Sequence, residues 1–135
     1  MTYHELTAED MAAALPARPG WYDATVTRAA LTKTPKALQL IAEFDIGENH
    51  TAGFRRPVAV DERKAAPFDA THGLRLLIAL MVISGMDVLP PGLEAADDAV
   101  GELSGLRVAV LVERSKRMSD PDNAVWRIRR VEERR

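Results

Sequence analysis

Five stretches of strand-like sequence are interrupted once, by a single long apolar stretch with helical spacing. The clearest strand covers residues 38–46, where Leu38, Leu40, Phe44 and Ile46 fall on alternate positions. Such alternation is typical of a strand with one buried and one solvent-facing side. Further strands are predicted at residues 21–31, 51–61, 105–114 and 124–132. The chain is therefore expected to fold around a β-sheet.

The interruption, at residues 71–85, is predicted to be the central helix. Its apolar residues are spread nearly all round: Leu74, Leu76, Leu77, Ile78, Leu80, Met81, Val82 and Ile83. A helix with this pattern is expected to be mostly covered by other structure. Two shorter helices are predicted, one at residues 8–15 with Thr7 as its N-cap, and an acidic one within residues 93–103.

The order of three strands, one apolar helix and two strands predicts a mainly β fold. We expect a five-stranded OB-type Greek-key barrel with a helix between strands 3 and 4 and a short N-terminal helix. The competing topology is a split βαβ sandwich, which needs two comparable helices in a different order. A single OB-fold domain is predicted over residues 1–135: N-terminal helix and linker at 1–19, barrel at 20–132 and tail at 133–135.

Composition and charge exclude several classes of protein. The chain has no cysteine, which excludes disulfides, zinc–thiolate sites and thiol nucleophiles. Residues 1–15 lack the basic start of a secretory signal, and the longest apolar stretch is far shorter than a membrane span. We therefore expect a cytoplasmic protein without a membrane partner. The formal net charge is −2, but residues 85–102 are acidic and residues 114–130 are predominantly basic.

No arrangement of residues predicts catalysis or metal binding. His4, His50 and His72 are each expected in a different terminus or loop, without HxH or HExxH spacing. The run Asp-Pro-Asp-Asn at 120–123 lacks the glycine and the terminal glutamate of an EF-hand loop and is typical of a turn. Phosphate-binding glycine loops and Gly-x-Ser-x-Gly are missing as well. We expect no enzyme, no cofactor and no metal.

Two blocks of sequence resemble a phage-associated family of uncharacterised proteins. The first has Pro-Gly-Trp-Tyr-Asp-Ala at 19–24, Lys33-Thr34, and Leu-Ile-Ala-Glu-Phe-Asp-Ile at 40–46. The second has Leu-Ser-Gly-Leu-Arg-Val-Ala-Val at 103–110 and Asn-Ala-Val-Trp-Arg-Ile at 123–128. Members are regarded as OB-fold proteins resembling single-stranded DNA-binding proteins. The resemblance implies an accessory protein of phage or prophage replication or recombination that binds single-stranded nucleic acid, with DNA favoured, and that has protein partners in such a module.

Basic residues fall where an OB barrel usually binds a single strand, over strands two and three and the flanking loops. Such a groove needs cations for the phosphates and flat side chains for the bases. The predicted binding residues are Lys33, Lys36, Arg55, Arg56, Lys116, Arg117, Trp126 and Arg127. Trp126 is the favoured stacking platform, although Trp21 and Trp126 could instead pack at the core or its rim. Phe54 is predicted in the core.

A second interpretation is a protein-interaction or structural module that uses the barrel only as a scaffold. The acidic stretch 94–102 and the N-terminal helix are then the candidate docking elements, and exposed edge strands would allow a homodimer. The two interpretations predict different surfaces. A continuous positive groove across strands two and three favours nucleic acid, whereas scattered charges beside an exposed apolar patch favour a protein partner.

Overall fold

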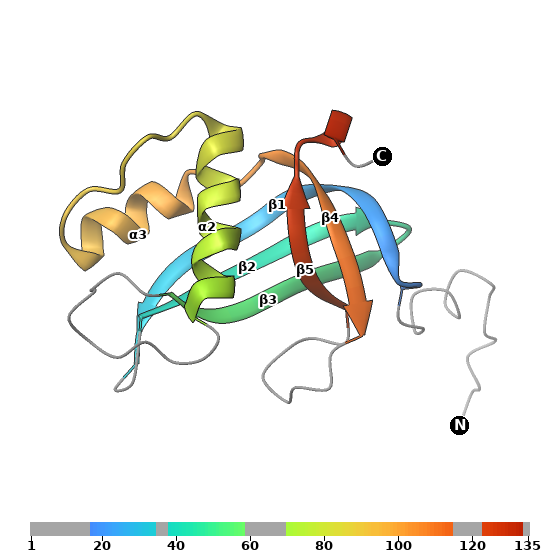
Figure 1. Cartoon of the computed structure of the whole chain (residues 1–135), viewed down its shortest axis with the longest axis horizontal. Helices are drawn as coiled ribbons and strands as arrows, with labels where there is room; N and C mark the ends of the chain where they lie inside the picture. Colours follow the sequence, from blue (N-terminus) through green and yellow to red (C-terminus); the bar gives the residue numbers. More distant parts are fainter. Residues whose placement is uncertain (1–16, 35–37, 59–69, 115–122, 134–135) are drawn as a thin grey trace, which may run out of the picture.

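The chain has a mainly β fold built on a closed five-stranded barrel (Figure 1). This computed structural model describes residues 17–34, 38–58, 70–114 and 123–133. The elements are β1 (Gly20–Lys33), β2 (Leu38–Gly47), β3 (His50–Val58), α2 (Ala70–Ser84), α3 (Leu93–Gly101), β4 (Arg107–Arg114), β5 (Asn123–Arg129) and the 3-10 turn η1 (Val131–Glu133). The strand order β1-β2-β3-β5-β4 confirms the predicted barrel and is consistent with an OB type. The helix predicted at 8–15 lies outside the described residues.

β1 closes the barrel because it pairs with a different neighbour along each half. Residues 20–25 pair antiparallel with β4, and residues 25–33 pair antiparallel with β2. The register shifts between Val26 and Arg28, so Thr27 is the extra residue of a β-bulge. A bulge bends and twists a strand, as a small closed barrel requires. Each barrel strand therefore has a partner on both sides. The pairing of β3 with β5 is limited to Gly53 and Ala124, and the expected homodimer through edge strands stays a prediction.

The barrel interior is filled by side chains at alternate strand positions. In β2, Leu40 and Phe44 are buried, whereas Glu43 and Asp45 are exposed. Phe44 contacts Phe54 of β3 across the core, with ring centroids 6.1 Å apart. Phe54 is thus a core residue, as predicted. Burial of these apolar side chains supplies the main driving force for the fold.

α2 fills the opening where β3 and β5 separate. The parallel pairing of the two strands joins Gly53 to Ala124, and β5 then rises away from β3 (Figure 1). α2 packs against both strands, with Leu76, Leu77 and Leu80 buried in the core. α2 therefore occupies the space between the diverging strands β3 and β5, and the candidate site lies beside this helix.

α2 exposes one narrow stripe of its surface to solvent. Ile78 and Val82 are 48% and 54% exposed, and Arg75 is exposed as well. These three residues are spaced three and four positions apart, so they form one solvent-facing stripe. Apart from this stripe and Ser84, residues 72–84 are buried or partly buried, so the helix is mostly covered, as predicted.

α3 attaches the acidic stretch of the chain to the barrel. It packs against β1, with Ala96 and Val100 buried under the helix. Oδ1 of Asp97 accepts a hydrogen bond from the backbone N–H of Leu31 at 2.8 Å. The Asp97 carboxylate of the acidic stretch therefore serves to attach α3 to β1.

Candidate functional site

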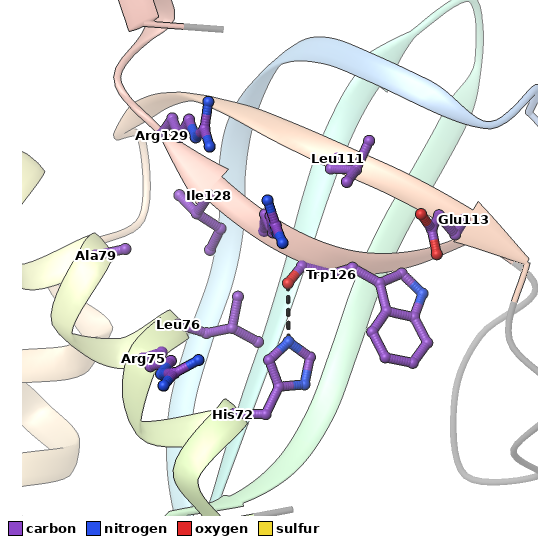
Figure 2. Close-up of a pocket in the computed structure, with 10 residues that line it drawn as sticks. His72, Arg75, Leu76, Ala79, Leu111, Glu113, Trp126, Ile128 and Arg129 are labelled. Carbon is purple, nitrogen blue, oxygen red and sulfur yellow. Dashed lines mark hydrogen bonds between the residues drawn. The ribbon is translucent and has the colours of Figure 1, made fainter.

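An open groove of about 970 Å³ lies between α2 and the strands β4 and β5 (Figure 2). Its apolar lining consists of Leu76, Ala79, Leu111 and Ile128. Its charged, polar and aromatic lining consists of His72, Arg75, Glu113, Trp126, Arg127 and Arg129. An apolar floor with a few polar groups around it is the usual make-up of a ligand-binding site.

The indole of Trp126 lies where three elements of the fold meet. His72 of α2 has its ring nearly parallel to the indole, at 19°, with the centroids 5.4 Å apart. Figure 2 shows the two rings side by side. The guanidinium carbon of Arg56, from β3, lies 5.2 Å from the Trp126 ring centroid, within cation–π range. These contacts hold the indole in one orientation at the edge of the groove.

His72 is attached to β5 by a hydrogen bond as well as by its ring. Its Nε2 lies 2.8 Å from the carbonyl oxygen of Trp126. A carbonyl oxygen only accepts, so Nε2 carries the proton and donates. The expectation that His72 lies in a terminus or loop is wrong, because it belongs to α2, where it is half-buried. Likewise, His50 begins β3.

A bulge in β5 determines which side chains reach the groove. Val112 pairs with Val125, and Leu111 pairs with Arg127, so Trp126 is the extra residue. Because one residue is inserted, Val125 and Ile128 both remain buried, and Arg127 points to solvent. Without the bulge, strict alternation would turn the side chain of Arg127 toward the core.

The described residues of the groove include three arginines and one glutamate. Arg75, Arg127, Arg129 and Glu113 are all exposed. Within the part of the chain that the structure describes, Arg75, Arg127 and Glu113 form no hydrogen bond or ion pair through their side chains. The guanidinium carbon of Arg129 lies 5.2 Å from the ring centroid of Trp21. The groove is therefore positive overall, and most of its charges are available to a ligand.

The predicted binding residues are distributed over several places. Trp126 and Arg127 both line the groove. Lys33 is exposed at the end of β1, and Arg55 is exposed on the outer face of β3. The remaining loop residues, Lys36, Lys116 and Arg117, lie outside the described residues.

Arg56 departs most from its predicted place as a groove cation. Its side chain is fully buried, and its Nη1 donates a hydrogen bond to the backbone carbonyl of Arg55 at 3.1 Å. Side chains alternate along a strand, so Arg56 shares the inner face of β3 with Phe54 and Val58. Arg56 therefore supports Trp126 from the core side and does not act as a surface cation.

The outer face of β2 and β3 carries charges of both signs. Glu43 and Asp45 are exposed on it, and Arg28 of β1 forms an ion pair with Glu43 at 3.4 Å. Arg55 lies opposite Ile41. The continuous positive groove across strands two and three that would favour nucleic acid is therefore not found among the described residues. The basic groove lies beside α2 instead.

Sequence reasoning did not assign His72, Arg75, Leu111 or Glu113 to a site. One signal was present: His72 and Arg75 are spaced three residues apart on a predicted helix and so share a face. The contact between that face and β5 is tertiary, and the sequence does not show it. Arg129 falls within the basic stretch 114–130 but was not among the predicted binding residues.

Two kinds of feature were not found among the described residues. No group of three or more His, Cys, Asp or Glu side chains in them is arranged to hold a metal ion. None of their helices combines the length and the apolar character needed to cross a membrane. Comparisons with protein-family models and with curated proteins gave no match. The geometry of the groove is therefore the basis for a functional proposal.

Proposed function

We propose that this chain is a non-enzymatic OB-type Greek-key barrel that binds single-stranded nucleic acid, DNA in the first place, in the groove between α2 and β5. The OB-type assignment is supported by the strand order and by the position of α2 after β3. The sequence resemblance supports an accessory role in phage or prophage replication or recombination.

One observation carries the proposal: a partly exposed tryptophan and three exposed arginines line the same groove. Arginine binds phosphate through several donors at once. Stacking of a base on an aromatic ring is worth roughly 1–3 kcal/mol. The buried Arg56 lies over the indole of Trp126, so the exposed part of the ring belongs to the groove side. A base can therefore stack there while the arginines hold the backbone.

The positions of the arginines suggest how a strand would lie. Arg75 projects from α2, and Arg127 and Arg129 project from β5. A single strand lying along the groove would thus have cations on both sides, with Trp126 at one end (Figure 2). Because ring and guanidinium contacts accept many bases, the contribution of these contacts should depend only weakly on sequence.

Fluorescence anisotropy with a labelled, mixed-sequence single-stranded DNA oligonucleotide tests this proposal. We expect binding at low salt and at least a roughly tenfold weaker affinity for the double variant Arg75→Ala/Arg127→Ala, because each charge-assisted contact is worth about 1.5–3 kcal/mol. The double variant Arg28→Ala/Arg55→Ala removes the same charge from the β1–β3 face and should bind within about twofold of the wild type. Equal losses in both variants, or no binding by the wild type at low salt, would overturn the proposal.

A protein partner is the second candidate function, and the exposed apolar residues favour it. Ile78 and Val82 lie on the outer stripe of α2, and Val88 and Leu93 are exposed in the segment that follows. Apolar side chains grouped on a surface are a common feature of protein interfaces. If the wild type fails to bind nucleic acid, the outer stripe of α2 becomes the main candidate site for a protein partner.

A further inference from the structure

Among the described residues, Glu113 is the one acidic side chain that lines the groove, and the other charged ones are arginines. It lies on β4, opposite Ala124 of β5, and is exposed. None of the described residues neutralises it by hydrogen bond or ion pair. A free carboxylate repels phosphate, so a bound strand must place something other than its backbone at this point.

The position of Glu113 relative to Trp126 indicates that the part of a bound strand next to Glu113 is a base. Both side chains lie at the same end of the groove, and the carboxylate is above the indole in the view of Figure 2. Ala124 faces Glu113 across the strands, and Trp126, the extra residue of the bulge, follows Ala124 by two positions. A base stacked on the exposed part of the indole would therefore direct an edge toward the carboxylate.

A carboxylate only accepts hydrogen bonds, so it distinguishes bases by their donors. Cytosine, adenine and guanine each carry an exocyclic amino group, and glutamate is a known acceptor for the amino group of cytosine. Thymine and uracil present two carbonyl oxygens around a single N–H, and these oxygens would be repelled.

We propose that Glu113 makes the groove selective for bases with an exocyclic amino group, so that cytosine is preferred over thymine. The inference rests on the proposed binding of single strands. It makes Glu113 a specificity-determining residue and assigns the base-reading position to the Trp126 end of the groove, while the arginines remain indifferent to sequence.

The test compares anisotropy titrations of labelled oligo-dC and oligo-dT at mildly alkaline pH and low salt. For the wild type we expect oligo-dC to bind about tenfold more tightly, the usual size of one good base contact. In Glu113→Gln the ratio should fall to within about twofold, because the amide also donates to thymine carbonyls. The control Glu102→Gln makes the same charge change at the end of α3 and should leave the ratio unchanged.

The outcomes distinguish failure of the base selectivity from failure of the proposed binding of single-stranded nucleic acid. If both strands bind the wild type equally, the selectivity is refuted and nucleic-acid binding stands. If Glu113→Gln strengthens both strands by the same factor, Glu113 acts only as a repelling charge, and the selectivity is refuted as well. If neither strand binds at low salt, both proposals fail together. The wild-type ratio needs no variant, so it is informative even if a substitution impairs folding.

Discussion

Gly73 shows how a missing side chain positions the groove. A Cβ atom at this residue would lie 2.9 Å from Cβ of Arg56 and would overlap the carbonyl oxygen of Pro57. The start of α2 can therefore approach β3 closely only because this residue is glycine. His72 is its neighbour in the chain, so the same close approach also determines where His72 meets Trp126.

We predict that Gly73→Ala lowers the free energy of unfolding by about 1–3 kcal/mol, because the added methyl group overpacks the contact with β3. Urea denaturation followed by circular dichroism measures this. Gly101→Ala is the matched control, since an added Cβ there meets nothing within 4 Å. It should be neutral or slightly stabilising, because alanine favours helix. Equal stability of the two variants would contradict the proposed close contact.

At the scale of elements, each helix has its own connection to the barrel. α2 bridges β3 and β5, whereas α3 packs against β1. The groove involves α2 but not α3. Attachment of α3 should therefore affect stability without affecting a ligand in the groove.

Asp97 provides the test of that separation. Asp97→Ala removes the acceptor of the Leu31 N–H, a bond that is partly buried, and we expect a loss of about 1–3 kcal/mol in stability. The adjacent Asp98 is exposed, and Asp98→Ala should change stability by less than about 0.5 kcal/mol. Thermal melts compare the two variants, with oligonucleotide affinity expected to stay at the wild-type value in both. A melting temperature for Asp97→Ala at or above that of Asp98→Ala would show that the hydrogen bond does not hold α3.

At the scale of the whole molecule, the net charge is small, but positive and negative side chains lie in different regions. The net charge is −2, so the chain as a whole does not attract a polyanion. Contact with phosphates must come from a local positive region, and the groove supplies one with three arginines against one glutamate. Specific placement of charge therefore matters more for this protein than its total.

This placement predicts the salt dependence of binding. Each phosphate contact to a single strand contributes roughly −0.7 to the slope of log K against log salt concentration, so three arginines predict a slope of about −2. Arg129→Ala should reduce its magnitude by roughly 0.7. Anisotropy titrations over a salt series measure both slopes. A slope near zero would exclude phosphate contacts, and one far steeper than −2 would place most contacts outside the groove.

The positions of the strands could be predicted from the sequence because alternation is a local property. The pattern from Leu38 to Ile46 corresponds to β2 almost residue for residue, and Phe54 lies in the core as expected. Each such prediction depends only on residues a few positions apart along one strand. The barrel was predicted from the number and order of these segments together with the family resemblance, and its closure is seen in the strand pairing.

The groove depended on contacts between segments far apart in the chain. The bulge at Trp126 turns Arg127 outward, and the register of β3 buries Arg56 although its chemistry suggested the surface. His72 meets Trp126 across 54 positions of sequence. Strand periodicity specifies which residues share a face, but bulges, pairing register and the packing of α2 decide which faces meet. These are cooperative properties of the folded barrel, and for that reason only the tertiary structure shows where the arginines, Glu113 and Trp126 come together.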